Sequence, residues 1–327
     1  MDVTLFDVKS YDKKSFALKN HYGYNLIFHE ASLNKDTAKL AAGSTAVVPF
    51  VNDDLSYPVL KELKDAGVEL IALRSAGFNN VDLKSAEAIG IKVARVPQYS
   101  PHAIAEEAIA LLLTLVRKLQ HSYVRSREFN FSLEGLVGFD LYGKTVGVIG
   151  TGRIGRAFID IAKGLGMHVL CYDPYPSQID GAEYSDLDVL YRRSDIISLH
   201  CPLTEQNIHM IDENAISKMK NGVYIINTSR GALIKSEDLL NALKSHKVGA
   251  AGLDVYEEEA GLFFSDNSVN GISDDILARL ISMPNVLVTG HQAYLTEEAL
   301  ESIAEVTLSN IRSFENGHLK NEVSSNQ

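Results

Sequence analysis

The sequence predicts an α/β protein whose parallel sheets are doubly wound, with helices on both sides. Short β-branched runs alternate with helical patterns along almost the whole chain, and a second series of this kind begins at Lys144. Such alternation of strand and helix signals is typical of parallel α/β sheets. With 327 residues and 46% hydrophobic content, the chain is long enough for two domains of this class.

The first series contains five expected strands separated by helical stretches. The strands are expected at residues 3–6, 25–28, 46–48, 69–73 and 92–95. The helical stretches are expected near residues 12–20, 35–42, 58–66 and 82–89.

The second series contains six expected strands, which a doubly wound sheet accommodates. They are expected at residues 145–149, 168–172, 195–200, 222–227, 249–253 and 286–289. Ser100 is a suitable cap for a helix that opens with Pro101 and runs to about Arg127, and residues 295–314 have a second long amphipathic pattern. We therefore predict one domain from residues 1–100 plus 296–327 and another from residues 101–295.

Charge and composition restrict the possible functions. The net charge is −11 and the sequence pI is about 5.4, so the surface repels nucleic-acid phosphates, although a small anion can still bind beside a local cation. Cys171 and Cys201 are the only cysteines and provide neither a disulfide framework nor a metal site. No apolar stretch reaches the length of a membrane span, and no secretory pattern opens the chain. We expect a cytoplasmic protein without metal, nucleic-acid or membrane partners.

The strongest single motif is the segment Val148-Ile149-Gly150-Thr151-Gly152-Arg153-Ile154-Gly155. It lies between an expected strand and an amphipathic helix, as a dinucleotide-binding turn requires. Gly150 permits the tight turn, Gly152 lets a pyrophosphate approach the backbone, and Gly155 lets helix and strand pack closely. Free N–H groups at the start of the helix attract phosphate. A glycine-rich turn without a ligand is the alternative, and the complete strand, helix and strand context disfavours it.

Asp173 ends the strand that follows this helix. A carboxylate at that place binds the adenosine ribose hydroxyls and repels a 2′-phosphate. The next residues, Pro174-Tyr175-Pro176, offer no arginine or lysine to compensate. The sequence therefore predicts NAD rather than NADP.

Candidate reacting groups follow three later strands. Arg230 and His291 each come just after an apolar strand, where open α/β sheets bind ligands. The planar fork of arginine suits a substrate carboxylate. A surface arginine and a structural histidine are the alternatives for these positions. The acids Glu257, Glu258 and Glu259 follow a third strand, and periodicity does not show which of them points inward.

Taken together, these motifs resemble the D-isomer-specific 2-hydroxyacid dehydrogenases, and most closely the bacterial fermentative D-lactate dehydrogenases. The resemblance covers nearly the whole chain and is carried by residues 50–54, 73–80, 150–155, 227–231, 252–259 and 290–292. It implies a flavodoxin-like substrate domain and a Rossmann NAD domain with an interdomain cleft. It also implies a homodimer or homotetramer.

The resemblance implies reversible reduction of a 2-ketoacid, pyruvate above all, to the D-2-hydroxy acid. His291 would be the acid/base, Glu259 its partner, and Arg230 the group that binds the substrate carboxylate. A neighbouring carboxylate stabilises the protonated imidazole that carbonyl reduction requires. Further substrate contacts are implied for Ser75, Ala76, Gly77 and Tyr99. The implied NAD contacts are Gly150, Gly152, Arg153, Ile154, Gly155, Asp173, Cys201, Pro202, Asn207, Thr228, Ser229 and Asp254.

Two positions depart from the pattern of many family members. Glu107 stands where they have histidine, and Gly290 stands where they have proline. The lactate-type subgroup tolerates this glycine, so Gly290 supports the narrower assignment. Two other functions are considered: the same chemistry on another 2-ketoacid, such as hydroxypyruvate or phenylpyruvate, and a non-catalytic NAD-sensing module. The presence of Arg230, Glu259 and His291 disfavours the sensing module.

Overall fold

A computed structural model describes residues 1–325 of the chain. The chain forms two compact units. The first contains residues 1–100 and the segment from Leu295 onwards, and the second is Pro101–Tyr294. Within the described residues, no helix is both long enough and apolar enough to cross a membrane.

The first unit is built on a five-stranded parallel sheet with the order β2-β1-β3-β4-β5. Its strands are β1 (Asp2–Leu5), β2 (Asn25–Phe28), β3 (Ala46–Val48), β4 (Leu70–Ala72) and β5 (Lys92–Ala94). This order is that of the flavodoxin-like doubly wound sheet, as the family resemblance implied.

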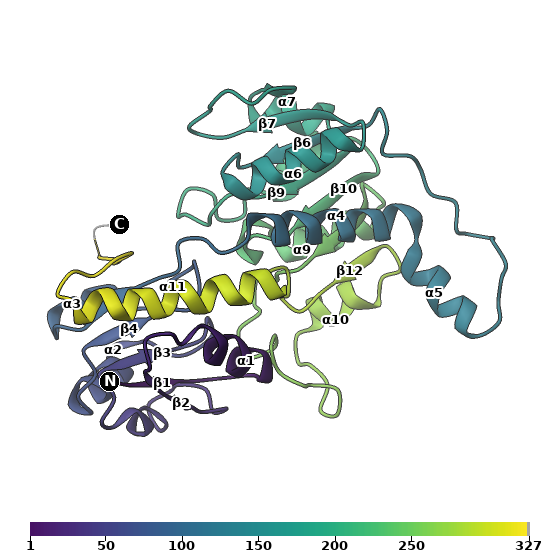
Figure 1. The fold of residues 1–327 in the computed structure, drawn as a ribbon. Coiled ribbons are helices and arrows are strands. Elements are labelled where there is room, and N and C mark those ends of the chain that lie inside the picture. Colours follow the sequence, from purple (N-terminus) through teal and green to yellow (C-terminus); the bar gives the residue numbers. More distant parts are fainter. Residues whose placement is uncertain (326–327) are drawn as a thin grey trace. The chain divides into compact units, whose positions relative to one another are not determined.

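Helices cover both faces of this sheet, because a parallel sheet is buried on both sides. Val3, Leu5 and Val48 pack under one pair of helices, which lie side by side in Figure 1, α1 (Ser10–Lys19) and α11 (Glu297–Glu315). Val47 and Ile71 face the other pair, α2 (Tyr57–Asp65) and α3 (Leu83–Ala88). The alternation of Val47 and Val48 between the two cores follows from the two-residue period of a strand.

The second unit contains a seven-stranded parallel sheet with the order β12-β11-β10-β9-β6-β7-β8. Its strands are β6 (Thr145–Ile149), β7 (His168–Tyr172), β8 (Ala182–Tyr184), β9 (Ile196–Leu199), β10 (Val223–Asn227), β11 (Val248–Leu253) and β12 (Val286–Val288). The order reverses between β6 and β9, as in a Rossmann sheet. The expectation of six strands was one short. The edge strand β8 was missed because its sequence, Ala-Glu-Tyr, has no apolar run.

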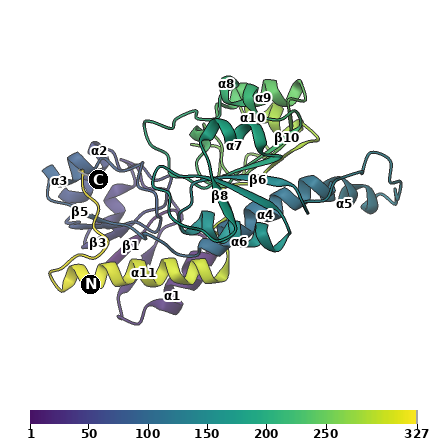
Figure 2. The same ribbon diagram turned by 90° about the horizontal axis from the view of Figure 1, so that it is seen from above.

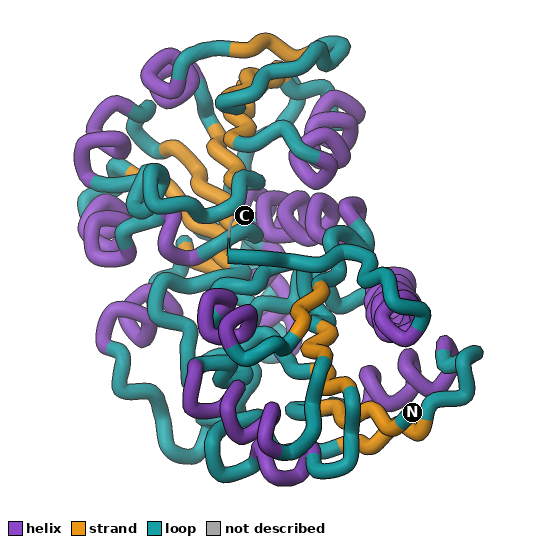
Figure 3. Tube along the Cα trace, turned by 90° about the vertical axis from the view of Figure 1, so that its left-hand side faces the viewer, coloured by secondary structure: helices purple, strands orange, loops and turns teal. Residues whose placement is uncertain are grey.

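Two layers of helices enclose this sheet. One face carries α4 (Pro101–Arg117) and α6 (Arg153–Gly164), and the opposite face carries α7 (Leu187–Arg193), α8 (Glu213–Lys218), α9 (Ser236–Lys244) and α10 (Asp275–Ser282) (Figure 2). Figure 3 shows the same arrangement, with helices flanking the strands of each sheet. The apolar side chains of each face form a separate core.

The long helix expected from Pro101 to about Arg127 is interrupted. Lys118 has a φ of +50°, a left-handed conformation that ends α4, and α5 (Leu119–Arg127) starts in a new direction. Residues 35–42 also differ from expectation, because only Ala38–Ala41 form a short 3₁₀ helix. There the Thr37 hydroxyl donates to the Ser32 carbonyl oxygen at 2.7 Å and competes with a regular helix.

Candidate active site

Three candidate reacting groups follow three neighbouring strands. Arg230 comes after β10, Glu259 after β11 and His291 after β12. These strands are adjacent and parallel, so their carboxyl ends lie at the same edge of the sheet. The fold thereby gathers side chains from distant parts of the sequence where open α/β sheets bind ligands.

His291 and Glu259 form a direct pair. The His291 Nδ1 lies 3.0 Å from Glu259 Oε1, and Glu259 Oε2 accepts from the Tyr256 N–H at 3.3 Å. The two side chains are 18% and 23% exposed, so both are accessible at the site but largely shielded. Phe264 packs beside the imidazole, with ring centroids 5.6 Å apart. Within residues 1–325 the hydrogen bond of the His291 ring is made by Nδ1, and Nε2 has no hydrogen-bond partner.

The turn that carries His291 is held by Asp254. His291 has a φ of +57°, an uncommon conformation for a residue with a side chain. The carboxylate of the fully buried Asp254 accepts from the Thr289 hydroxyl at 2.5 Å and from the N–H groups of Gln292 and Ala293, both at 2.8 Å. Burial raises the pKa of Asp254, and these donors oppose that rise. Sequence reasoning missed this supporting role, because two of the three donors are backbone groups that carry no residue signature.

Arg230 lies on a loop that packs directly on the acidic segment. Its Nη1 donates to the Ser229 carbonyl oxygen at 2.7 Å, and its own carbonyl oxygen accepts from Asn227 Nδ2 at 2.8 Å. A Cβ added to Gly231 would lie 2.0 Å from the backbone of Tyr256, so the two loops touch at that glycine. The guanidinium keeps further N–H donors in its planar fork, the geometry that binds a carboxylate through two hydrogen bonds.

The structure resolves which of the three consecutive acids point inward. Glu259 pairs with His291, Glu258 is exposed, and Glu257 forms an ion pair with His209 and accepts from the Ser236 N–H at 2.9 Å. The pKa of Glu257 is lowered, because these hydrogen bonds outweigh the opposing effect of burial. His209 was not among the predicted residues, and no sequence signal separates it from the other histidines.

The glycine loop has the geometry of a phosphate-binding turn. A Cβ on Gly150 would lie 2.6 Å from the Cys201 backbone nitrogen, and one on Gly155 would lie 2.0 Å from the Gly150 carbonyl oxygen. A Cβ on Gly152 would meet nothing within 4 Å. Gly152 is also the N-cap residue of α6, and it has no side chain that could accept from the first N–H groups of the helix. The helix start therefore presents these N–H groups beside open space. These features fit a dinucleotide pyrophosphate.

The other predicted cofactor residues surround the point where the strand order reverses. Ser229 Oγ donates to the Cys201 carbonyl oxygen at 2.5 Å, and Asn207 Nδ2 donates to the Pro202 carbonyl oxygen at 2.8 Å. The Thr228 hydroxyl is buried and has no hydrogen-bond partner within residues 1–325. Burial raises the pKa of the Cys201 thiol to about 11, so this group is uncharged at neutral pH.

His200 packs against the glycine loop. A Cβ on Gly150 would meet the His200 backbone at 2.6 Å, and the His200 ring lies 4.7 Å from that of Phe158. Its Nε2 pairs with the Ser198 hydroxyl at 2.8 Å, and its buried Nδ1 has no partner in the described chain. Burial lowers the pKa of His200 to about 3, so the ring is neutral at any ordinary pH. No pattern in the sequence distinguishes His200 from the other histidines.

The predicted substrate residues Ser75, Ala76, Gly77 and Tyr99 belong to the five-stranded unit. Ser75 Oγ donates to the Gly77 carbonyl oxygen at 2.8 Å, and Arg95 Nη1 donates to the Ala76 carbonyl oxygen at 3.0 Å. Tyr99 is half-buried. Both hydrogen bonds stabilise the loop after β4 through its carbonyl oxygens. The N–H groups of the loop take part in neither bond, so they are the groups that could donate to an anion.

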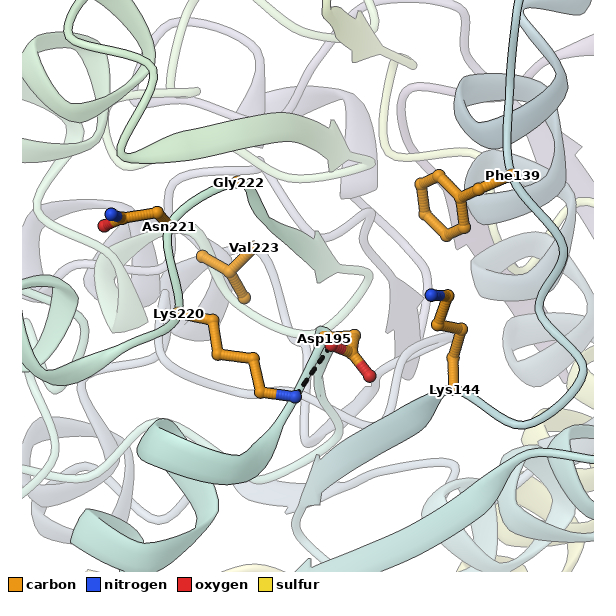
Figure 4. Close-up of a pocket in the computed structure, with 7 residues that line it drawn as sticks. All are labelled: Phe139, Lys144, Asp195, Lys220, Asn221, Gly222 and Val223. Atoms are coloured by element: carbon orange, nitrogen blue, oxygen red, sulfur yellow. Dashed lines mark hydrogen bonds and ion pairs between the residues drawn. The ribbon is translucent and has the colours of Figure 1, made fainter.

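A cavity lies at the opposite edge of the seven-stranded sheet, at the amino ends of β6, β9 and β10 (Figure 4). Phe139 and Lys144 face Lys220 across it, and the Lys220 ammonium is paired with Asp195 at 2.7 Å. None of the predicted site residues lines this cavity. It is therefore separate from the candidate active site.

The fold and these groups define a class of protein, namely an NAD-binding oxidoreductase with a histidine–carboxylate pair and an arginine at the cofactor edge. Comparison with known proteins agrees. Residues 109–293 match the sequence model described as "D-isomer specific 2-hydroxyacid dehydrogenase, NAD binding domain". The chain belongs to this family.

Individual relatives are similar over almost their whole length. The chain is 54% identical to D-lactate dehydrogenase of Escherichia coli over 97% of this chain and 98% of the relative. The apo-structure of the Escherichia coli enzyme superimposes with a TM-score of 0.91 and covers 99% of this chain and 100% of that one, at 51% identity. A structure titled as the pyruvate reductase of Chlamydomonas reinhardtii gives a TM-score of 0.93 at 44% identity, with 97% of both chains covered.

Proposed function

We propose that this protein is an NADH-dependent D-lactate dehydrogenase that reduces pyruvate to D-lactate and catalyses the reverse reaction. The observation that carries the proposal is the His291–Glu259 pair at 3.0 Å, which joins the ends of the adjacent strands β12 and β11, with Arg230 after the next strand, β10. The names of the similar proteins support the substrate assignment.

Arg230 would bind the substrate carboxylate and polarise the neighbouring carbonyl group. Pyruvate carries its carboxylate next to the ketone, so one arginine reaches both groups. Its fork donates two parallel hydrogen bonds, and burial of the pair strengthens the interaction. Substrate contacts of the Ser75–Ala76–Gly77 loop and of Tyr99 remain a prediction from the family resemblance.

His291 would supply the proton. Nδ1 is held by Glu259, so Nε2 is the nitrogen that delivers a proton to the carbonyl oxygen. When bound, NADH supplies the hydride for the carbonyl carbon. The imidazole left after reduction is neutral, and the same nitrogen accepts the hydroxyl proton of lactate in the reverse reaction. Glu259 orients the ring through its contact with Nδ1.

An assay with a panel of 2-ketoacids tests this function. NADH oxidation is followed with pyruvate, hydroxypyruvate, phenylpyruvate and a longer aliphatic 2-ketoacid, and the product is analysed on a chiral column. We expect the highest kcat/KM for pyruvate and D-lactate as the product. A higher kcat/KM for another ketoacid would transfer the assignment to that substrate. NADH binding without ketoacid-dependent oxidation would favour an NAD-sensing module, and L-lactate as product would refute the proposal.

We also propose that the protein is a homo-oligomer, a dimer or a tetramer. The segment that comprises α5 and the following loop, here called the arm (residues 119–142), extends away from the seven-stranded sheet in Figure 1. No residue of α5 is buried, and the arm exposes large apolar side chains at Leu119, Tyr123, Val124, Phe129, Phe131, Leu133, Val137 and Tyr142. So many exposed apolar groups on one segment are typical of a surface that another chain covers.

Light scattering after size-exclusion chromatography tests this assembly. We expect the double variant Phe131→Asp, Leu133→Asp to have a smaller mass than the wild-type protein. Val269→Asp is the matched control, because Val269 is also an exposed apolar residue but lies outside the arm. A monomeric wild-type protein would contradict the proposal. A cytoplasmic location remains a prediction of the sequence.

A further inference from the structure

The carboxylate of Asp173 is held in place by a hydrogen-bond network. Thr151 donates both its backbone N–H and its hydroxyl to Asp173 Oδ2, at 2.7 and 3.0 Å. The Tyr175 N–H donates to Oδ1 at 2.9 Å. The hydroxyl of Tyr184 donates to Thr151 Oγ1 at 2.8 Å. The network joins the glycine loop, the loop after β7 and the edge strand β8, all within one compact unit.

The direction of these bonds follows from the number of hydrogens. Thr151 has one hydroxyl hydrogen, which it uses toward the carboxylate, so its oxygen must accept from another donor. Tyr184 is that donor, and its own oxygen accepts weakly from the Ser177 N–H at 3.4 Å. Tyr184 thereby keeps the Thr151 hydrogen pointing at Asp173.

The network also limits the number of hydrogen-bond acceptor positions that Asp173 offers to a ligand. A carboxylate has about four lone-pair positions, and three of them are taken by the two Thr151 donors and the Tyr175 N–H. The remaining position is on Oδ1. Asp173 therefore presents one acceptor in a fixed direction, instead of a freely rotating pair of oxygens.

We propose that Tyr184 and Thr151 are positioning residues that fix Asp173 as the acceptor for one adenosine-ribose hydroxyl and so set the preference for NADH over NADPH. A held carboxylate cannot turn away from a 2′-phosphate, so the full repulsion between the two anions is retained. Once the network is loosened, the carboxylate rotates and a cation reaches the phosphate. Arg156 is such a cation, since its Nη2 already contacts Ser177 Oγ of the same loop at 2.5 Å. The inference rests on the proposed use of NADH but not on the identity of the ketoacid.

Matched variants and two cofactors test the inference. Thr151→Val removes the hydroxyl and keeps the shape of the side chain, and Thr151→Ser keeps the hydroxyl. Tyr184→Phe removes only the hydroxyl that donates to Thr151 Oγ1. The dissociation constants of NADH and NADPH are measured by the change in cofactor fluorescence, without any ketoacid. We expect Thr151→Val to weaken NADH about tenfold, or ~1.4 kcal/mol, as the loss of one hydrogen bond to a charged group implies. Tyr184→Phe should weaken it about threefold, and Thr151→Ser should leave it unchanged.

The ratio of the NADPH and NADH dissociation constants separates positioning from a merely structural role. We expect this ratio to fall about tenfold in Thr151→Val and about threefold in Tyr184→Phe. We also expect the double variant to be no worse than Thr151→Val alone, because Tyr184 acts through Thr151. Equal weakening of both cofactors, or no change in either, would overturn the inference. Failure of the wild-type protein to oxidise NADH with pyruvate would count only against the proposed lactate activity, since these titrations contain no ketoacid.

Discussion

Mild acid should destabilise the seven-stranded unit through a single histidine. His200 is buried beneath the glycine loop, and burial alone lowers its pKa from 6.5 to about 3. The His200 ring contacts the Ser198 hydroxyl at 2.8 Å and the Phe158 ring at 4.7 Å between centroids, and neither group carries a charge. The folded unit therefore excludes the protonated ring.

The magnitude follows from proton linkage. In the unfolded chain His200 returns to a pKa near 6.5 and binds a proton below that pH, whereas the folded unit does not bind it until the pH approaches 3. Stability is thus unaffected well above pH 6.5 and falls as the pH decreases from there toward 3. Between about pH 7.5 and about pH 5, these two pKa values give a loss of about 2 kcal/mol in the free energy of unfolding.

Urea unfolding of the wild-type protein and of His200→Gln measures this loss. The glutamine amide can replace Nε2 as the partner of Ser198, and the chain has no tryptophan, so circular dichroism reports unfolding. Other buried acids titrate in both proteins, among them Asp53 with a pKa raised to about 6, and their effects cancel in the difference. We expect the wild-type protein to lose about 2 kcal/mol more than the variant between the two pH values. If both proteins lose the same amount, burial does not keep His200 neutral and the reasoning is wrong.

Three further predictions concern the site itself. His291→Gln should lower kcat about a thousandfold in steady-state assays, while NADH still binds in a fluorescence titration, because only proton transfer is removed; near-normal turnover would exclude His291 as the proton donor. Arg230→Lys should raise the KM for pyruvate more than it lowers kcat, because a lysine cannot form the two parallel hydrogen bonds; an unchanged KM would contradict the carboxylate-binding role. Gly155→Ala should lower stability by roughly 2–3 kcal/mol, since its Cβ would lie 2.0 Å from a backbone oxygen, whereas Gly152→Ala should fold normally and weaken NADH. Thermal melts and cofactor titrations of this glycine pair check the contrast, and the opposite pattern would refute the proposed phosphate geometry.

Much of the fold was predictable, because its signals are local. The expected strands at residues 25–28, 46–48, 145–149 and 168–172 coincide with β2, β3, β6 and β7. β-branched runs and helical periodicity are properties of neighbouring residues, so they can be recognised without knowledge of the tertiary contacts. The short edge strand β8 and the break at Lys118 were missed, because neither has a distinctive local sequence.

The sequence by itself determined the doubly wound class, the glycine turn before α6 and the strand ends on which Arg230 and His291 lie. The family resemblance implied Glu259 as the partner of His291, but the sequence pattern did not distinguish the three acids; the tertiary structure pairs Glu259 with His291 and Glu257 with His209, although the two acids are nearly adjacent in the chain. It also decided that Asp254 holds the His291 turn and that Tyr184 reaches Thr151. These contacts depend on hydrogen bonds between segments brought together by sheet order, and hydrogen bonds need atoms within about 3 Å, a condition that no pattern along the chain encodes.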